Sequence, residues 1–142
     1  MKENTCFQKK ITTEIMSWIE NNLEHRISLE DISKVSGYSN WHFQRLFKKH
    51  TGKNLGDYIL ERKLKKSYNL LSTTKLSVFA VSCAVGFKTQ QSFIRSFKKC
   101  YGISPGKIKM KHNDKKKKYN KLYHHGGILP IHIVYRVNPS LI

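Results

Sequence analysis

"GYSNWHFQRLFKKHTG", residues 37–52, has a near copy later in the chain, "GFKTQQSFIRSFKKCYG", residues 86–102. Each copy opens with glycine and an aromatic residue, continues into Phe-x-Arg-x-Phe-Lys-Lys, and closes on glycine. The copies align from end to end once one extra residue is allowed in the turn of the second. The repetition predicts that one structural unit is built twice in this chain.

A short helix is predicted immediately before each copy. In "SLEDISKVSG", Ser28 is a suitable N-cap, Asp31 completes a capping box, and Gly37 can adopt the left-handed conformation that ends a helix. Ser77 takes the place of Ser28 before the second copy. A short helix, a glycine-containing turn and a second helix make a helix-turn-helix unit, so two such units are predicted.

Apolar periodicity predicts the remaining helices. One helix is expected over residues 11–23, a long one over residues 55–71 with Asn54 as cap, and a last one after Pro105. The core is expected to include Ile32 and Val35 from the short helix and a stripe of the long helix made of Leu60, Leu64, Tyr68 and Leu71. Phe43, Phe47, Phe93 and Phe97 are assigned to the core as well.

These elements predict an all-α fold of two helix-turn-helix subdomains joined by a long central helix. They divide the chain into a first subdomain (8–53), a linker helix (54–72) and a second subdomain (73–110). Residues 111–142 form a basic C-terminal tail to which the pattern assigns no structure.

The charge is strongly positive and unevenly distributed. The 142 residues carry 27 Lys and Arg against 9 Asp and Glu, a net charge of +18. Residues 1–61 are almost balanced, with 9 basic and 8 acidic side chains, whereas residues 62–142 hold 18 basic side chains and one acidic one. A field of this size favours a polyanionic partner such as nucleic acid or an anionic surface.

Targeting signals and cysteine motifs are missing from the sequence. Neither a signal peptide nor an apolar run long enough for a membrane span is recognised, so a cytoplasmic protein without a membrane partner is expected. The three cysteines form no C-x-x-C pair, which argues against a disulfide framework, a zinc site or another metal cofactor. Cys83 and Cys100 are expected to be small core residues.

The outward faces of the two repeated helices carry base-reading chemistry. With the phenylalanines inward, Trp41, Gln44, Arg45 and Lys48 face outward in the first copy, and Gln90, Gln91, Ile94, Arg95 and Lys98 in the second. Arginine can form two hydrogen bonds with guanine and glutamine two with adenine, while Trp41 or Ile94 can cover a thymine methyl group. Two different faces predict an asymmetric rather than a palindromic site.

Other classes of function fit the sequence less well. No acid–base cluster, phosphate-binding glycine loop or metal motif is recognised, so an enzyme is not expected. A nonspecific architectural nucleic-acid-binding protein would share the charge but would not need two base-reading faces. It stays open as the alternative, and competition by unrelated DNA would distinguish the two.

In "SGYSNWHFQRLFKKHTG" and "GFKTQQSFIRSFKK" the chain resembles the AraC/XylS family of transcription regulators, and within it the small stand-alone MarA-type activators. The resemblance covers residues 8–110, where it implies a DNA-binding domain with a fold of about seven helices. It also implies monomeric binding to promoter DNA, contact with RNA polymerase, and activation of stress or multidrug-resistance promoters. No small-molecule effector domain is implied, and the protein is expected on the nucleoid when bound to DNA.

The family's DNA contacts can be carried over residue by residue. Its base contacts fall on Trp41, Gln44, Arg45, Gln90, Gln91, Ser92 and Arg95. Its phosphate contacts fall on Ser39, Asn40, Lys48, Lys49, Thr89 and Lys98. The chain departs from the family after Pro105, where Ile108 and Lys109 replace the Tyr-Arg pair that often ends the second motif.

The C-terminal tail matches no part of the family pattern. It holds a lysine run at residues 115–118, which is typical of a flexible phosphate-binding arm or of a solvated tail. Its end, "ILPIHIVYRV", fits an edge strand, a partner-binding segment or a disordered chain. His124, His125 and His132 lack cysteine or acidic partners, so no metal site is predicted there.

Overall fold

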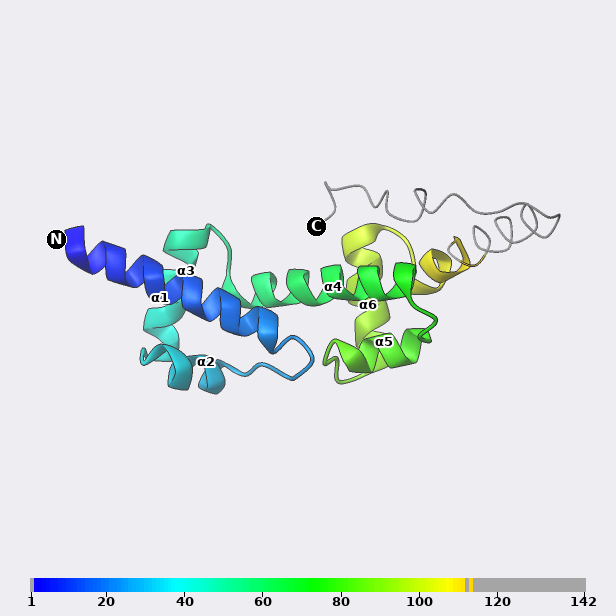
Figure 1. The fold of residues 1–142 in the computed structure, drawn as a ribbon, viewed down its shortest axis with the longest axis horizontal. Coiled ribbons are helices and arrows are strands. Elements are labelled where there is room, and N and C mark those ends of the chain that lie inside the picture. The colour runs from blue at the N-terminus through cyan, green and yellow to red at the C-terminus, as the bar shows by residue number, and fades with distance from the viewer. Residues whose placement is uncertain (1, 112, 114–142) are drawn as a thin grey trace, which may run out of the picture.

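The computed structural model describes residues 2–111 and 113, and all regular structure in this part of the chain is helical (Figure 1). One further helical segment, residues 105–111, follows six labelled helices. These six are α1 (Lys2–Asn21), α2 (Leu29–Ser36), α3 (Asn40–Thr51), α4 (Leu55–Thr73), α5 (Val78–Ala84) and α6 (Gln90–Tyr101). The predicted all-α fold is confirmed.

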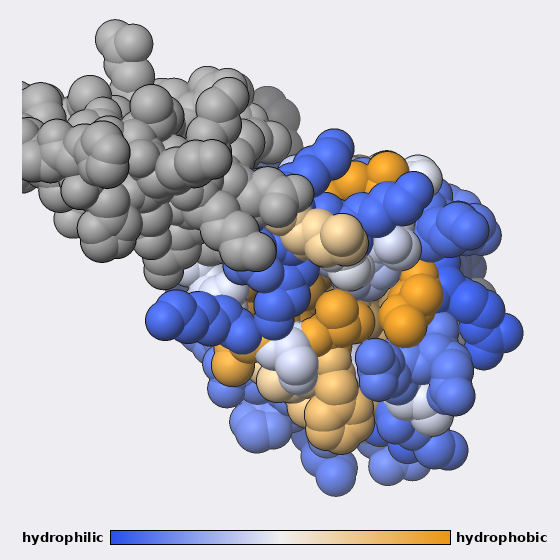
Figure 2. Space-filling view, turned by 90° about the vertical axis from the view of Figure 1, so that its right-hand side faces the viewer, coloured by the Kyte–Doolittle hydropathy of each residue, from blue (hydrophilic) through white to orange (hydrophobic). Residues whose placement is uncertain are grey.

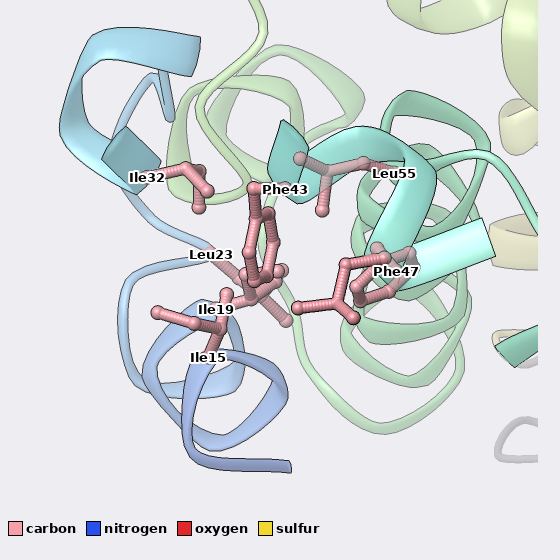
Figure 3. Packing of buried hydrophobic residues seen from close by; sticks show 8 residues of the cluster. Ile15, Ile19, Leu23, Ile32, Phe43, Phe47 and Leu55 are labelled. Carbon is pink, nitrogen blue, oxygen red and sulfur yellow. The ribbon is translucent and has the colours of Figure 1, made fainter. Parts of the chain in front are cut away.

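Two groups of helices lie at the two ends of α4 (Figure 1). We call α1, α2 and α3 the first unit, and α5, α6 and residues 105–111 the second unit. Each unit has a separate hydrophobic core to which α4 contributes. The first core contains Ile15, Ile19, Leu23, Ile32, Phe43, Leu46, Phe47 and Leu55 (Figure 3). The second contains Leu64, Leu71, Val81, Val85, Phe93, Phe97 and Ile108.

The predicted serine caps begin the short helices of both units, and the predicted glycine ends α2, whereas α5 ends at Val85 just before Gly86. Ser28 and Asp31 form the reciprocal capping box of α2, with the Asp31 N–H donating to Ser28 Oγ at 3.1 Å and the Ser28 N–H donating to Asp31 Oδ2 at 2.9 Å. In the second unit, Ser77 Oγ accepts from the Ala80 N–H at 3.0 Å. Gly37 ends α2 in the left-handed conformation, with φ of 71°. Asn54 lies at the N-cap of α4, but its side chain makes no capping hydrogen bond.

Helices α3 and α6 are anchored in the same way. Each has 12 residues and buries a pair of phenylalanines one turn apart, all four fully inaccessible to solvent: Phe43, Phe47, Phe93 and Phe97. Tyrosines of α4 contact both pairs, with ring centroids 5.4 Å apart for Tyr58 and Phe47 and 6.3 Å apart for Tyr68 and Phe97. The linker helix is therefore packed directly against both repeated helices.

Helix α1 is longer than the sequence pattern indicated. It begins at Lys2 rather than near Ile11. The sequence pattern missed these first turns because they are mainly polar and show no apolar period. The core prediction was also wrong at two aliphatic positions. Val35 is 47% exposed because α2 is only 8 residues long and buries Ile32 alone. Leu60 is 37% exposed because it lies beside the buried face of α4, which consists of Leu55, Lys63, Leu64, Ser67 and Leu71.

The cysteines were assigned to the core incorrectly. Cys83 and Cys100 are both exposed. Beside Cys100, Tyr101 packs against Phe97 instead, with ring centroids 4.7 Å apart. The larger aromatic side chain thus takes the inward position that the helical period had given to the thiol.

The end of the molecule formed by the second unit has a mixed surface. Apolar side chains gather in the middle of this face and hydrophilic ones surround them (Figure 2). The second unit leaves Phe79 and Met110 largely exposed, at 60% and 65%. Within residues 2–111 and 113, no helix has both the length and the apolarity that crossing a bilayer requires.

The capping box makes stability depend on pH. Hydrogen bonds from the Ser28 side chain and backbone hold the pKa of Asp31 below its usual range. A carboxyl group of this kind stabilises the fold above its unfolded pKa, and the contribution is lost as the pH falls through the folded pKa. We expect Asp31→Asn to lower the free energy of unfolding at pH 7 and the difference from wild type to narrow toward pH ~3.

Urea unfolding followed by circular dichroism at several pH values measures this difference. Glu30→Gln is the matched control, since it removes a charge from the same first turn of α2 outside the capping box. A difference for Asp31→Asn that stays constant from neutral to acidic pH would contradict the assignment.

Candidate nucleic-acid interface

The exposed residues of α3 and α6 form the candidate interface. In α3 the side chains of Trp41, Gln44, Arg45 and Lys48 are all exposed, as predicted from the inward position of the phenylalanines. In α6 the corresponding exposed residues are Gln91, Arg95 and Lys98, with Gln90 half-buried beside them. These side chains lie mainly on the N-terminal halves of their helices, the part of a recognition helix that reaches base edges.

Trp41 and Arg45 form a pair within the first interface. Trp41 is 66% exposed, and the guanidinium carbon of Arg45 lies 4.6 Å from the centroid of its ring. A guanidinium stacked on an indole gains cation–π energy and loses rotamer freedom, so Arg45 is partly ordered before any ligand binds. In α6 the residue one turn before Arg95 is Gln91, which offers no such platform.

Two predicted base-reading residues in α6 are less accessible to solvent than predicted. Ile94, predicted to face outward, is half-buried and packs against the second core, because its position borders the stripe of Phe93 and Phe97. Ser92 is also half-buried, and its hydroxyl donates to the Thr89 carbonyl oxygen at 2.8 Å. Of the predicted α6 readers, Gln91 and Arg95 are therefore the most accessible.

The residues predicted to bind phosphate gather at the helix ends. Ser39 caps α3 by accepting from the His42 N–H at 3.4 Å, and Thr89 caps α6 by accepting from the Ser92 N–H at 3.1 Å. Both caps are exposed. Helix N-termini attract anions through their free N–H groups and the helix dipole, so the two caps are suited to backbone phosphates.

The other predicted phosphate ligands differ in accessibility. Lys48, Lys49 and Lys98 are exposed in the C-terminal parts of α3 and α6. Asn40 is half-buried at the start of α3, and its Oδ1 is buried without a hydrogen-bond donor among the described residues. The lysines are thus free to reach a polyanion, whereas the acceptor atom of Asn40 is turned away from solvent.

Helix α1 adds a residue that the sequence analysis did not include. An open hollow of about 530 Å³ is lined by Gln8 of α1 and by five residues of α3: Trp41, His42, Arg45, Leu46 and Lys49. Gln8 reaches this position because α1 starts nine residues before the predicted helix. Its place one turn before the buried Thr12 was the available signal, but a polar residue adds nothing to an apolar period.

No cluster of metal ligands is present among residues 2–111 and 113. The histidines considered above, His124, His125 and His132, lie outside the described residues, as does the lysine run at 115–118. What the described surface offers is two exposed sets of hydrogen-bonding and cationic side chains on duplicated helices.

The chain is similar in sequence to known proteins. Residues 32–111 match the model of a helix-turn-helix domain family. The transcriptional activator AarP of Providencia stuartii is 45% identical over 104 residues, which cover 73% of this chain and 77% of that protein. The multiple antibiotic resistance protein MarA of Escherichia coli (strain K12) is 43% identical over 96 residues, covering 68% and 76%.

A solved structure of similar fold leads to the same kind of protein as the sequence relatives. The transcriptional regulator from Chromobacterium violaceum, described as an AraC-type DNA-binding domain-containing protein, superposes with a TM-score of 0.67 and 28% identity, covering 75% of this chain and 96% of that one. Fold, repeated motifs and relatives coincide, and the chain belongs to the AraC-type helix-turn-helix family of DNA-binding transcription regulators.

Proposed function

We propose that this protein is a sequence-specific transcription activator that binds an asymmetric promoter site as a monomer. The supporting observation is the presence, in one chain, of two recognition helices whose exposed side chains differ. Trp41, Gln44 and Arg45 occupy α3, while Gln90, Gln91 and Arg95 occupy α6. One chain would then engage two successive segments of the major groove, as a dimer of single units does elsewhere.

The length of α4 suits this mode of binding. Its 19 residues span roughly 28 Å at the rise of an α-helix. With the widths of the two units added, the recognition helices approach the ~34 Å that separates major-groove segments on one face of DNA. If the pair is held slightly closer than straight DNA requires, bending of the duplex costs about 1 to 6 kcal/mol.

The relatives support the regulatory direction. AarP is named a transcriptional activator, and MarA a multiple antibiotic resistance protein. By analogy we propose that the chain activates promoters of stress or multidrug resistance, contacts RNA polymerase, and works in the cytoplasm on the nucleoid. The base readers would be Trp41, Gln44, Arg45, Gln90, Gln91, Ser92, Ile94 and Arg95, and the phosphate ligands Ser39, Asn40, Lys48, Lys49, Thr89 and Lys98.

Selection from a random pool of ~20-base-pair DNA tests the proposal directly. At ~150 mM salt, where nonspecific binding is weak, we expect enrichment of one asymmetric motif with two half-elements about one helical turn apart. An unselective outcome would reject sequence-specific reading and leave the nonspecific architectural alternative, which the high positive charge of the chain also supports.

The base-reading assignment is tested by two arginine variants. Arg45→Ala and Arg95→Ala should each weaken binding to the selected site by about 1 to 3 kcal/mol while leaving binding to random DNA nearly unchanged. Arg26→Ala is the matched control, because it removes the same exposed charge from the connection between α1 and α2. Equal losses on selected and random DNA would show that the two arginines contribute charge only.

The phosphate assignment predicts a different pattern. Lys48→Ala and Lys98→Ala should weaken binding to all sequences alike and reduce the salt slope by about one each. Lys34→Ala, an exposed lysine of α2, serves as the comparison on the same unit. Binding titrations over a range of salt concentrations give both quantities, and a loss confined to the selected site would reassign these lysines to base reading.

A further inference from the structure

A buried lysine joins the two units. Lys63 lies in the middle of α4 and is only 7% exposed. Its ammonium group donates to the carbonyl oxygens of Leu23 at 3.0 Å, His25 at 2.8 Å and Val85 at 2.7 Å, with Gly86 O farther away at 3.5 Å. An ammonium group has three N–H donors, and here each finds a close acceptor.

The three acceptors come from both sides of the molecule. Leu23 and His25 belong to the connection between α1 and α2 in the first unit, whereas Val85 lies in the turn between α5 and α6 in the second. Figure 1 shows the two connections next to each other below α4. Lys63 therefore links the backbones of the first and second units through a single charged group.

Electrostatics favour a cation at this position. The carbonyls that Lys63 binds follow the C-terminal ends of α1 and α5, where helices leave acceptors unpaired and carry partial negative charge. Burial lowers the pKa of Lys63, and the nearby charge of Lys66 lowers it further. Removing the ammonium group would leave the carbonyl oxygens of Leu23 and Val85, two buried residues, without this donor.

Gly86 shows how closely the two connections approach. Its φ is +66°, and a Cβ added there would lie 2.7 Å from both His25 O and Lys63 Nζ and 2.9 Å from Glu24 O. The equivalent glycine of the first unit, Gly37, has nothing within 4 Å of the same point. Glycine at position 86 thus serves the contact between the units as well as the left-handed turn itself.

Two partly exposed ion pairs lie near Lys63 on α4. Arg62 binds Glu20 with two hydrogen bonds, one of them 2.8 Å between Nη2 and Oε2, and Lys66 binds Glu24 at 3.0 Å. Both pairs join α4 to the first unit only, and their exposure limits their strength. The Lys63 carbonyl bonds, by contrast, reach the second unit as well.

We propose that Lys63 is a positioning residue that sets the orientation of α3 relative to α6, and thereby the narrow range of half-element spacings that the protein accepts. This inference rests on the proposed bipartite reading of DNA. Lys63 need not touch DNA in this role. It acts through the backbones that it holds together.

A spacing series tests the consequence for DNA. Starting from the selected site, the half-elements are moved apart or together by one and two base pairs, and the affinity is measured at each spacing. The affinity of the wild-type protein should fall about tenfold or more for each base pair of displacement, since the protein or the DNA must deform to fit. Lys63→Met should bind the best site more weakly and show a flatter profile, whereas Lys65→Met, an exposed neighbour on α4, should follow wild type.

A distance measurement tests the orientation without DNA. Spin labels on the exposed Cys6 of α1 and Cys100 of α6, in a Cys83→Ser background, report the separation of the two units. Lys63→Met should broaden the distance distribution and Lys65→Met should not. Gly86→Ala, which forces the same connections apart, is a second disruption, with Gly37→Ala as its control for the left-handed strain alone.

The outcomes separate the two proposals. If wild type selects no bipartite site, the proposed function fails, and the label distances still decide whether Lys63 holds the units. If wild type is bipartite but Lys63→Met has a parallel spacing profile and an unchanged distance distribution, Lys63 is merely stabilising and the positioning role is rejected. Should Lys63→Met fail to fold in circular dichroism, Gly86→Ala decides by the same two readouts.

Discussion

The burial of two phenylalanine pairs is the constraint on which the rest of this structure depends. Phe43 and Phe47 in α3, and Phe93 and Phe97 in α6, are fully inaccessible and one helical turn apart within each pair. Burying two aromatic rings from one face of a helix leaves the opposite face exposed, because a helix presents residues three and four apart on the same side. The burial of each phenylalanine pair therefore decides which side chains of α3 and α6 are exposed.

The same pairs connect the recognition helices to the linker. Tyr58 contacts Phe47 edge to face, and Tyr68 stacks on Phe97, so α4 is held at both ends by aromatic contacts. Between these contacts Lys63 bonds to backbone carbonyls of both units. The long helix thus combines three functions in one element. It extends from the first unit to the second, contributes to both cores, and joins the α1–α2 connection to the turn between α5 and α6.

The two units are built alike but are not equivalent at the surface. Arg45 lies over an exposed Trp41, whereas the residue one turn before Arg95 is Gln91, which is not aromatic. Ile94 is drawn toward the second core, which leaves α6 a more polar exposed face than α3. A repeated scaffold with diverged exposed residues gives one chain two different sets of hydrogen-bonding groups, which is the basis of the asymmetric site proposed above.

The sequence by itself, through local signals, determined the duplicated helix-turn-helix units, their serine caps and the burial of the phenylalanines. It also determined the exposure of Trp41, Gln44 and Arg45. A capping residue or an apolar period acts within one or two turns, so it can be recognised without knowing what lies opposite. Tertiary structure alone decided that Val35, Leu60, Cys83 and Cys100 stay at the surface, since each depends on which neighbour fills the core. It also decided the burial of Lys63, because that lysine is stable inside only where the ends of α1 and α5, far apart in the chain, bring their carbonyls together.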